Sequence, residues 1–211
     1  MKILVIGASQ GTGAETVKNA LQRGHAVTAF ARSPRKLQLE HEHLHRLQGD
    51  FHQADSVARA VAGHDAVIIT ASATSFKAFK ANPNYFSQGT RYVIDAMKEQ
   101  GVKRLGVLSA FGAGDSRRAA NWFLNKLMIS WLLKVPYEDH ERQERLVMDS
   151  GLEWVIARPT RLTNGPADGR YLIETQIAAV PSRISRADVA DFLVRAVTEE
   201  TWLGKAVQLG G

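Results

Sequence analysis

The chain of 211 residues contains no cysteine. This absence excludes disulfide bonds, thiolate nucleophiles and metal sites with cysteine ligands. It is also usual in proteins of reducing compartments, so a cytoplasmic location is expected. Apolar residues make up 45% of the sequence and charged residues 23%, which is typical of a globular protein and not of a disordered chain.

Long apolar runs and concentrated blocks of charge are also missing. No uncharged apolar stretch approaches the ~20 residues that cross a bilayer. The first residues pass directly into Gly7 without the apolar region or cleavage site of a signal peptide. The formal net charge is +6, but Lys and Arg are dispersed and form no basic stripe. We therefore expect no membrane or nucleic acid as partner, and we predict no metal site.

Short apolar runs alternate with helix-like segments along the whole chain. The predicted strands cover Lys2–Ile6, Ala26–Ala31, His45–Gly49, Ala66–Thr70, Arg104–Ser109, Trp154–Arg158 and Ala206–Leu209. Apolar residues at helical spacing and terminal glycines predict helices over Gly11–Arg23, Ser56–Ala62, Phe86–Gln100, Tyr137–Ser150 and from the capping residue Ser185 to about Thr198. This alternation predicts an α/β fold, a doubly wound parallel Rossmann sheet with helices on both faces, formed by residues 1–211 as one domain.

Three glycines follow the first predicted strand and open the first helix, in the sequence GASQGTG. Gly7 permits the tight turn, Gly11 lets the backbone approach a pyrophosphate, and Gly13 allows close packing of helix on strand. The free amides and the positive dipole end of the helix then face the phosphates. The segment favours a dinucleotide site over an ordinary flexible turn, and the site includes the intervening residues Ser9, Gln10 and Thr12.

The end of the second predicted strand distinguishes NAD from NADP. An NAD site usually places Asp or Glu there to accept hydrogen bonds from the ribose 2′-hydroxyl. Here the segment from Phe30 to Lys36 contains no acid. Its cations and hydroxyl suit a 2′-phosphate, which Arg grips through two N–H bonds, although a solvated basic loop is the alternative. NADP(H) is therefore expected in preference to NAD(H), with Arg32, Ser33 and Arg35 as candidate ligands.

Further motifs extend the pattern over nearly the whole chain. They are GD at 49–50, AGHDAVI at 62–68, SAFGAG from Ser109, DSGLEWVIARP at 149–159 and SRADVADFL at 185–193. With the glycine turn, these residues resemble the short-chain dehydrogenase/reductase superfamily. Within the superfamily they resemble in particular its compact atypical, NAD(P)H-binding (NmrA-like) branch, which includes the biliverdin-IXβ/flavin reductases. The glycine spacing departs from the usual G-x-x-G-x-x-G, because Gln10 occupies the middle position and Gly11 follows it.

The resemblance implies roles for individual positions. Asp50 and Phe51 would lie beside the adenine, and Ser109 would lie close to the nicotinamide, unless its hydroxyl only caps a strand end. Substrate-side elements would cover about 110–140 and 160–185. Other residues that would line the cofactor are Thr70, Ala71, Ser72, Ala73 and Pro159.

The Tyr-x-x-x-Lys pair of typical superfamily members, in which lysine lowers the tyrosine pKa, is absent. The lysine position falls on His140 and the tyrosine position on Pro136, one residue before Tyr137. The biliverdin/flavin reductases share the Asp-His at 139–140, and flavins or quinones can accept hydride first and a proton from solvent. His140 is either a proton relay or ribose contact, or a solvated helix residue. The catalytic candidates are Ser109, Tyr137 and His140.

The segment 120–135 is rich in large apolar side chains, among them Trp122, Phe123, Met128 and Trp131. It suits a lid over a flat substrate, a packed core helix or an oligomer contact. The sequence is compatible with a monomer or a homodimer.

Three functions are consistent with these patterns. We favour an NADPH-dependent oxidoreductase that transfers hydride to a small, flat electron acceptor such as a flavin, a quinone or a related carbonyl or enone. A non-catalytic NADP(H)-binding redox sensor is the main alternative, favoured by the missing Tyr–Lys pair. An NAD-dependent epimerase or dehydratase is a third, against which the short C-terminal part argues.

Overall fold

The computed structural model describes residues 1–72, 81–119, 133–176 and 178–211. Its strands are β1 (Lys2–Ile6), β2 (Ala26–Ala31), β3 (Leu44–Gln48), β4 (Ala66–Ile69), β5 (Arg104–Leu108), β6 (Glu153–Pro159), β7 (Arg161–Thr163), β8 (Leu172–Glu174), β9 (Arg183–Ser185) and β10 (Lys205–Gly210). Its helices are α1 (Gly11–Gln22), α2 (Ala54–Val61), α4 (Tyr85–Gln100), α5 (Lys134–Met148) and α6 (Arg186–Thr198). Short 3-10 turns are η1 (Pro34–Lys36), η2 (Gly114–Ala119) and η4 (Glu200–Trp202).

The described strands form an eight-stranded main sheet in the order β3-β2-β1-β4-β5-β6-β10-β8. All neighbours are parallel except β8, which runs antiparallel to β10 at the edge. The strand order reverses between β1 and β4, and this is the position where open α/β sheets bind their ligands. The predicted Rossmann fold is confirmed.

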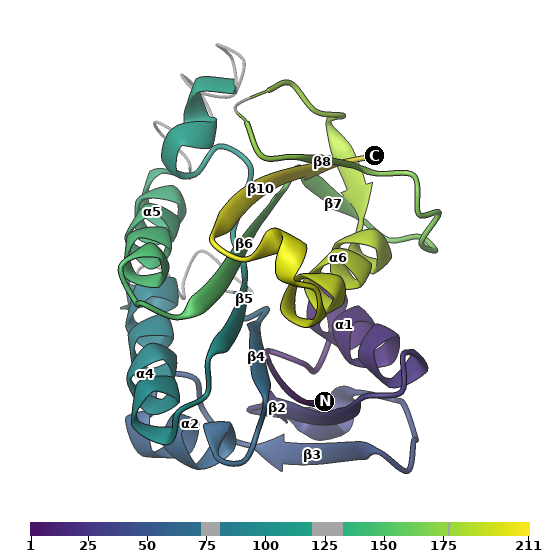
Figure 1. The fold of residues 1–211 in the computed structure, drawn as a ribbon, viewed down its shortest axis with the longest axis vertical. Coiled ribbons are helices and arrows are strands. Elements are labelled where there is room, and N and C mark those ends of the chain that lie inside the picture. Colours follow the sequence, from purple (N-terminus) through teal and green to yellow (C-terminus); the bar gives the residue numbers. More distant parts are fainter. Residues whose placement is uncertain (73–80, 120–132, 177) are drawn as a thin grey trace.

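Helices cover both faces of this sheet (Figure 1). Helices α1 and α6 pack on one face, and α2, α4 and α5 pack on the other. Strand β1 shows why both faces are buried: Ile3 and Val5 belong to the first core, whereas Leu4 and Ile6 belong to the second. Successive strand residues point to opposite faces, so a continuous apolar run suits a strand buried on both sides.

Helix α5 begins at Lys134, three residues before the start that the sequence predicts. Pro136 is the third residue of this helix, and the missing amide proton of a proline in the first turn breaks no intrahelical hydrogen bond. The sequence-based prediction also missed β7, β8 and β9, which are three residues long each. Strands β7 and β9 pair with one another in a separate small sheet.

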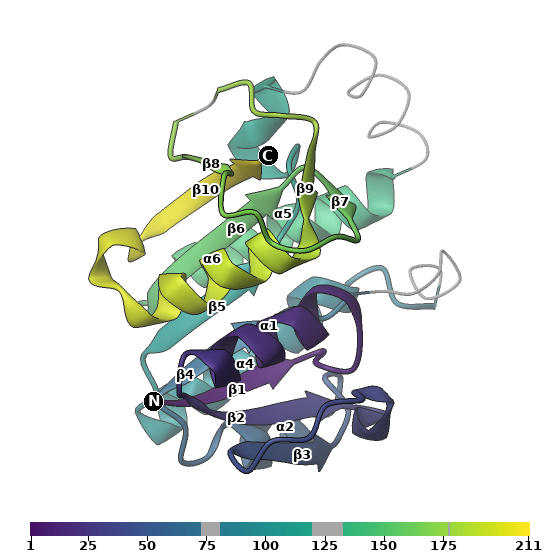
Figure 2. The same ribbon diagram turned by 90° about the vertical axis from the view of Figure 1, so that its right-hand side faces the viewer.

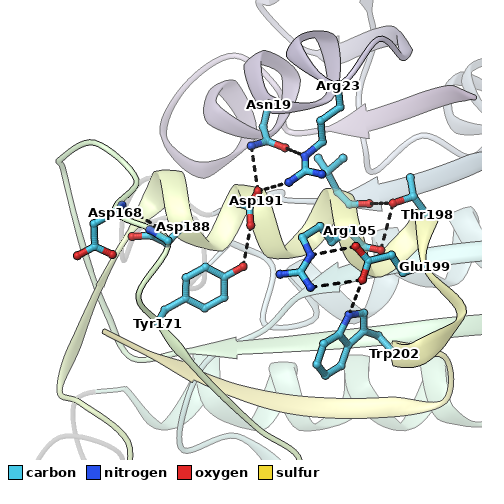
Figure 3. Close-up of polar contacts among 12 residues, drawn as sticks. Asn19, Arg23, Asp168, Tyr171, Asp188, Asp191, Arg195, Thr198, Glu199 and Trp202 are labelled. Carbon is cyan, nitrogen blue, oxygen red and sulfur yellow. Dashed lines mark hydrogen bonds and ion pairs between the residues drawn. The ribbon is translucent and has the colours of Figure 1, made fainter.

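An excursion between β7 and β8, residues 164–171, is tied to helix α6 (Figure 3). The predicted helix cap is present, since Ser185 Oγ accepts a hydrogen bond from the Asp188 amide at 2.9 Å. Asp188 Oδ1 accepts from the amides of Asp168 and Gly169 at 3.2 and 3.0 Å. Asp191 Oδ2 accepts from the Tyr171 hydroxyl at 2.8 Å. Two carboxylates of α6 therefore hold the excursion in place.

Within the described ranges, no helix has both the length and the apolar character that crossing a membrane requires.

Candidate cofactor site

A cavity of about 360 Å³ opens at the carboxyl end of the sheet, beside the turns that follow the neighbouring strands β1 and β4. It brings together nine of the predicted cofactor residues: Gly7, Ser9, Gln10, Arg32, Ser33, Asp50, Phe51, Ala71 and Ser72. These residues come from the turns after β1, β2, β3 and β4. The parallel sheet unites them because the carboxyl ends of its strands meet at one edge.

Two glycines of the first turn are required by packing. Gly7 has φ +87°, and a Cβ there would lie 2.7 Å from Ala71 Cα. A Cβ on Gly13 would overlap the Gly7 carbonyl oxygen and lie 2.7 Å from Thr70 Oγ1. Thr70 is itself held, because its hydroxyl donates to the Ile6 carbonyl at 2.9 Å. Glycine therefore lets the start of α1 press onto the ends of β1 and β4.

The start of α1 suits an anion. The helix begins at Gly11, which has φ +58°, and Thr12 in its first turn is buried. The capping residue Gln10 makes no side-chain hydrogen bond to the first turn, and that turn carries no acid. The first amides of the helix and its positive dipole end are therefore available to the phosphates of a ligand.

The cations after β2 divide between two places. Arg32 and Lys36 line the cavity together with Ser33, whereas Arg35 lines a separate groove beside Glu40. The 3-10 turn η1 explains the division, since residues in such a turn point about 120° apart. The structure thus does not bring Arg35 into the cavity. Lys36 belongs to the basic segment after β2 but was not among the residues predicted to bind the cofactor.

The cavity is also lined by residues that were not predicted from the sequence. Tyr85, the first residue of α4, lines the cavity, and its ring lies 4.4 Å from that of His52. Asp50 is held in place, since its Oδ1 accepts from the His52 amide at 2.9 Å. Burial lowers the pKa of His52. The other missed lining residues are Ile6, Phe30, Ala31 and Gly49.

Ser109, the residue predicted to lie at the nicotinamide, forms part of a buried ionic cluster. Its hydroxyl donates to Glu144 Oε1 at 2.7 Å. Both oxygens of Glu144 accept from Arg158, at 2.9 Å from Nε and 2.8 Å from Nη2, and Arg158 Nη1 lies 2.5 Å from Asp115. The single hydroxyl hydrogen of Ser109 is therefore already engaged.

Tyr137 is also engaged. Its hydroxyl donates to the Phe111 carbonyl at 3.0 Å, and burial raises its pKa. Pro159 lies at the end of β6, where its carbonyl accepts from the Phe111 amide at 2.9 Å. These contacts join the turn after β5 to the end of β6 and to α5.

His140 is half-buried and packs against a neighbouring helix, so the predicted alternative of a solvated helix residue is wrong. Its ring stacks on Phe86, with centroids 4.0 Å apart and planes 17° from parallel. Nδ1 lies 3.0 Å from Gln143 Oε1, while the Gln143 amide donates to Thr90 Oγ1 at 2.9 Å. Nδ1 must therefore carry the ring hydrogen. Burial lowers the His140 pKa, which favours the neutral ring.

The neighbouring residue, Asp139, has a structural role that the sequence analysis did not identify. It is fully buried and accepts from the Phe86 amide at 2.6 Å and from the Ser87 hydroxyl at 2.5 Å. Phe86 and Ser87 lie in the first turn of α4, so a carboxylate of α5 caps that helix.

Several predicted features lie outside the described residues: Ala73 and the apolar side chains Trp122, Phe123, Met128 and Trp131. Among the residues that the structure describes, no group of three or more His, Asp or Glu is placed to hold a metal ion.

The reversal of strand order, the glycine turn and the amides of α1 define a dinucleotide-binding Rossmann protein. The NAD(P)H-binding family model matches residues 7–200, and the chain belongs to this family. The NAD(P)H-binding family expected from the sequence is thereby confirmed.

Curated relatives extend over the whole chain. An uncharacterised chloroplastic protein of Arabidopsis thaliana is 27% identical and covers 99% of this chain and 76% of its own length. A reductase of Aspergillus terreus is 24% identical over 98% of this chain and 97% of the relative.

Two solved structures share the fold. A short-chain dehydrogenase/reductase of Veillonella parvula in complex with NADP has a TM-score of 0.84 at 16% identity, covering 100% of this chain and 94% of that one. An anaerobilin reductase of Escherichia coli O157:H7 has a TM-score of 0.82 at 22% identity, covering 100% and 97%.

Proposed function

We propose that the protein is an NADPH-dependent reductase that transfers hydride to a small, flat electron acceptor such as a flavin or a quinone. The observation that carries the proposal is the cavity at the reversal of strand order, which combines the amide-rich turn with Arg32 and Lys36. The name of the Aspergillus reductase, and those of the NADP-bound and anaerobilin-reducing neighbours in fold, are consistent with it.

The preference for NADPH follows from the charges near the end of β2. Arg32, Ser33 and Lys36 follow that strand and line the cavity. They offer two cations and a hydroxyl to a 2′-phosphate. The acid of the cavity, Asp50, follows β3 instead and is held by the His52 amide. The 2′-phosphate of the cofactor would therefore meet guanidinium and ammonium groups at the position where an NAD site places a carboxylate.

The class of acceptor follows from the proton donors. Ser109 and Tyr137 already donate their hydroxyl hydrogens to protein oxygens, and His140 has a lowered pKa and donates from Nδ1. None of the three candidates is poised to protonate an alkoxide as it forms. Bound NADPH supplies the hydride. Flavins, quinones and extended conjugated systems delocalise the resulting charge and take their proton from solvent, whereas simple ketones do not.

The same contacts favour one alternative, a protein that binds NADP(H) without turnover and reports the redox ratio to a partner. A panel of acceptors separates the two functions. Purified protein with NADPH is mixed with FMN, a benzoquinone, biliverdin and a simple aldehyde, and absorbance at 340 nm is followed. We expect oxidation of NADPH with one or more of the first three and none with the aldehyde. Tight NADPH binding with a flat trace for every acceptor would support the sensor instead.

A charge reversal tests the cofactor preference. Arg32→Glu should weaken NADPH at least tenfold more than NADH, because a charge-assisted hydrogen bond contributes about 1.5–3 kcal/mol. The matched control is Arg35→Glu, which makes the same charge change in the separate groove. Equal losses for both dinucleotides, or equal losses in both variants, would contradict the assignment of the 2′-phosphate to Arg32.

A further inference from the structure

Arg186 is the first residue of α6, and this helix packs beside α1 (Figure 2). Helix α6 leads through η4 into β10, which is parallel to β6, so α6 begins at the carboxyl edge of the sheet. Helix α1 begins at the same edge, directly after β1. The two helices therefore start side by side, and Arg186 stands next to the glycine turn.

The side chain of Arg186 lies against the turn itself. Its Nε and Cδ are 3.6 and 3.8 Å from the point where a Cβ on Gly11 would be. Its Nη1 donates to the amide oxygen of Asn164 at 2.7 Å. In the described part of the chain no carboxylate lies within ion-pair distance of Arg186. Because a neutral amide orients the guanidinium, the full positive charge and further N–H donors remain for an anion.

We propose that Arg186 is a cofactor-binding residue that contacts the pyrophosphate from the α6 side, at the phosphate nearer the nicotinamide. The inference rests on the proposed binding of a dinucleotide at the glycine turn. Arg32 and Asp50 follow β2 and β3, on one side of β1 in the sheet, whereas α6 packs on β4, β5 and β6, on the other side of β1. Arg186 therefore approaches the turn from the side opposite the adenine.

Because Gly11 has no side chain, the pyrophosphate of the cofactor and the guanidinium of Arg186 can both approach its backbone and contact one another. Gly11 has φ +58° and its open face is bordered by Arg186. Asn164, the partner of Arg186, begins the excursion that Asp188 and Asp191 tie to α6 (Figure 3). Arg186 thus links the phosphates of the cofactor to the segment that follows β7.

Binding of three ligands to the full-length protein tests this role. NADPH and NADH both carry the pyrophosphate, whereas 2′,5′-ADP carries the 2′-phosphate and only the phosphate nearer the adenine. Calorimetry on Arg186→Gln should show an increase in Kd of about tenfold for NADPH and by the same factor for NADH, since one charge-assisted contact is lost. The Kd for 2′,5′-ADP should change by less than about twofold, because this contact is absent from that complex.

Two further variants serve as controls for the loss of the Arg186 charge. Arg170→Gln removes an equal charge from an exposed arginine of the excursion, and it should bind all three ligands as the unaltered protein does. Arg186→Lys keeps the charge, and it should restore part of the lost affinity. Thermal melting of each variant shows that it is folded.

The outcomes distinguish the inference from the function on which it rests. Unchanged binding of both dinucleotides by Arg186→Gln overturns the inference, as does a loss for NADPH alone or an equal loss for 2′,5′-ADP. If the unaltered protein binds NADPH but reduces no acceptor, the reductase proposal fails and the role of Arg186 is still decided by the affinities. If it binds neither dinucleotide, both fail.

Discussion

Removing the carboxylate of Glu144 should destabilise the protein more than removing any surface charge. The Glu144 side chain is 2% exposed and that of its partner Arg158 is 5% exposed. Two hydrogen bonds of 2.9 and 2.8 Å join them, and Ser109 donates a third to the carboxylate. Glu144→Ala would leave the guanidinium inside the protein with Asp115 as its remaining ionic partner.

The size of the effect follows from this burial. Breaking a buried ion pair from one side costs about 3–5 kcal/mol, because the other charge stays uncompensated. Asp115 still neutralises Arg158 in part, so we expect the lower end of this range, about 3 kcal/mol. For a chain of this length each kcal/mol shifts Tm by about 2–4 °C. The Tm of Glu144→Ala should therefore fall by about 6–12 °C.

Calorimetric melting measures this shift, and two variants control it. Asp115→Asn removes the other carboxylate, which is 60% exposed, and should cost at most about 1 kcal/mol. The pair Glu144→Met with Arg158→Met removes both buried charges and should recover part of the loss. A Tm for Glu144→Ala within about 2 °C of the unaltered protein would refute the reasoning. So would a double variant less stable than the single one.

Three other predictions concern packing, pH and catalysis. Gly13→Ala should lower both stability and NADPH affinity, because its Cβ would overlap the carbonyl oxygen of Gly7. Gly165→Ala, with open space around it, should leave both unchanged in melting and binding assays. Burial lowers the pKa of His64 and His140 from 6.5, so below that pH the unfolded chain binds more protons than the folded one. The free energy of unfolding should then fall as pH drops from about 6.5 to 5, and His140→Asn should show a shallower slope in urea titrations; an equal slope would contradict this assignment. Ser109→Ala should reduce the rate of FMN reduction by less than about threefold, since its hydroxyl hydrogen is engaged; a loss of about a hundredfold would show a catalytic hydroxyl.

The glycine turn and the residues directly after β2 could be predicted from local sequence. Gly7, Gly11 and Gly13 act within one turn, and their spacing alone predicts a strand, a tight turn and a helix start. Arg32 and Ser33 follow β2 directly, so knowing where that strand ends is enough to place them at the cavity. Arg35 could not be placed in this way. In the 3-10 turn η1 its side chain points into the separate groove, whereas Lys36 lines the cavity.

The roles of Ser109 and His140 depended on residues far along the chain. Ser109 meets Glu144 across 35 positions, and His140 stacks on Phe86 of another helix. No local sequence pattern indicates that a hydroxyl lies beside a buried carboxylate. From the sequence alone, Ser109 and His140 therefore remain candidate proton donors. The structure shows them engaged, which supports the flavins and quinones that the sequence already favoured as acceptors.

By itself, the sequence determined the fold class and the glycine turn, because hydrophobic periodicity and glycine spacing act over a few neighbouring residues. Only the tertiary structure decided which polar groups are paired and which charges face the turn. Arg186 belongs to the last third of the chain, yet it lies against Gly11 because α6 packs beside α1. Pairing of this kind depends on how helices and strands pack, which residue order alone does not reveal.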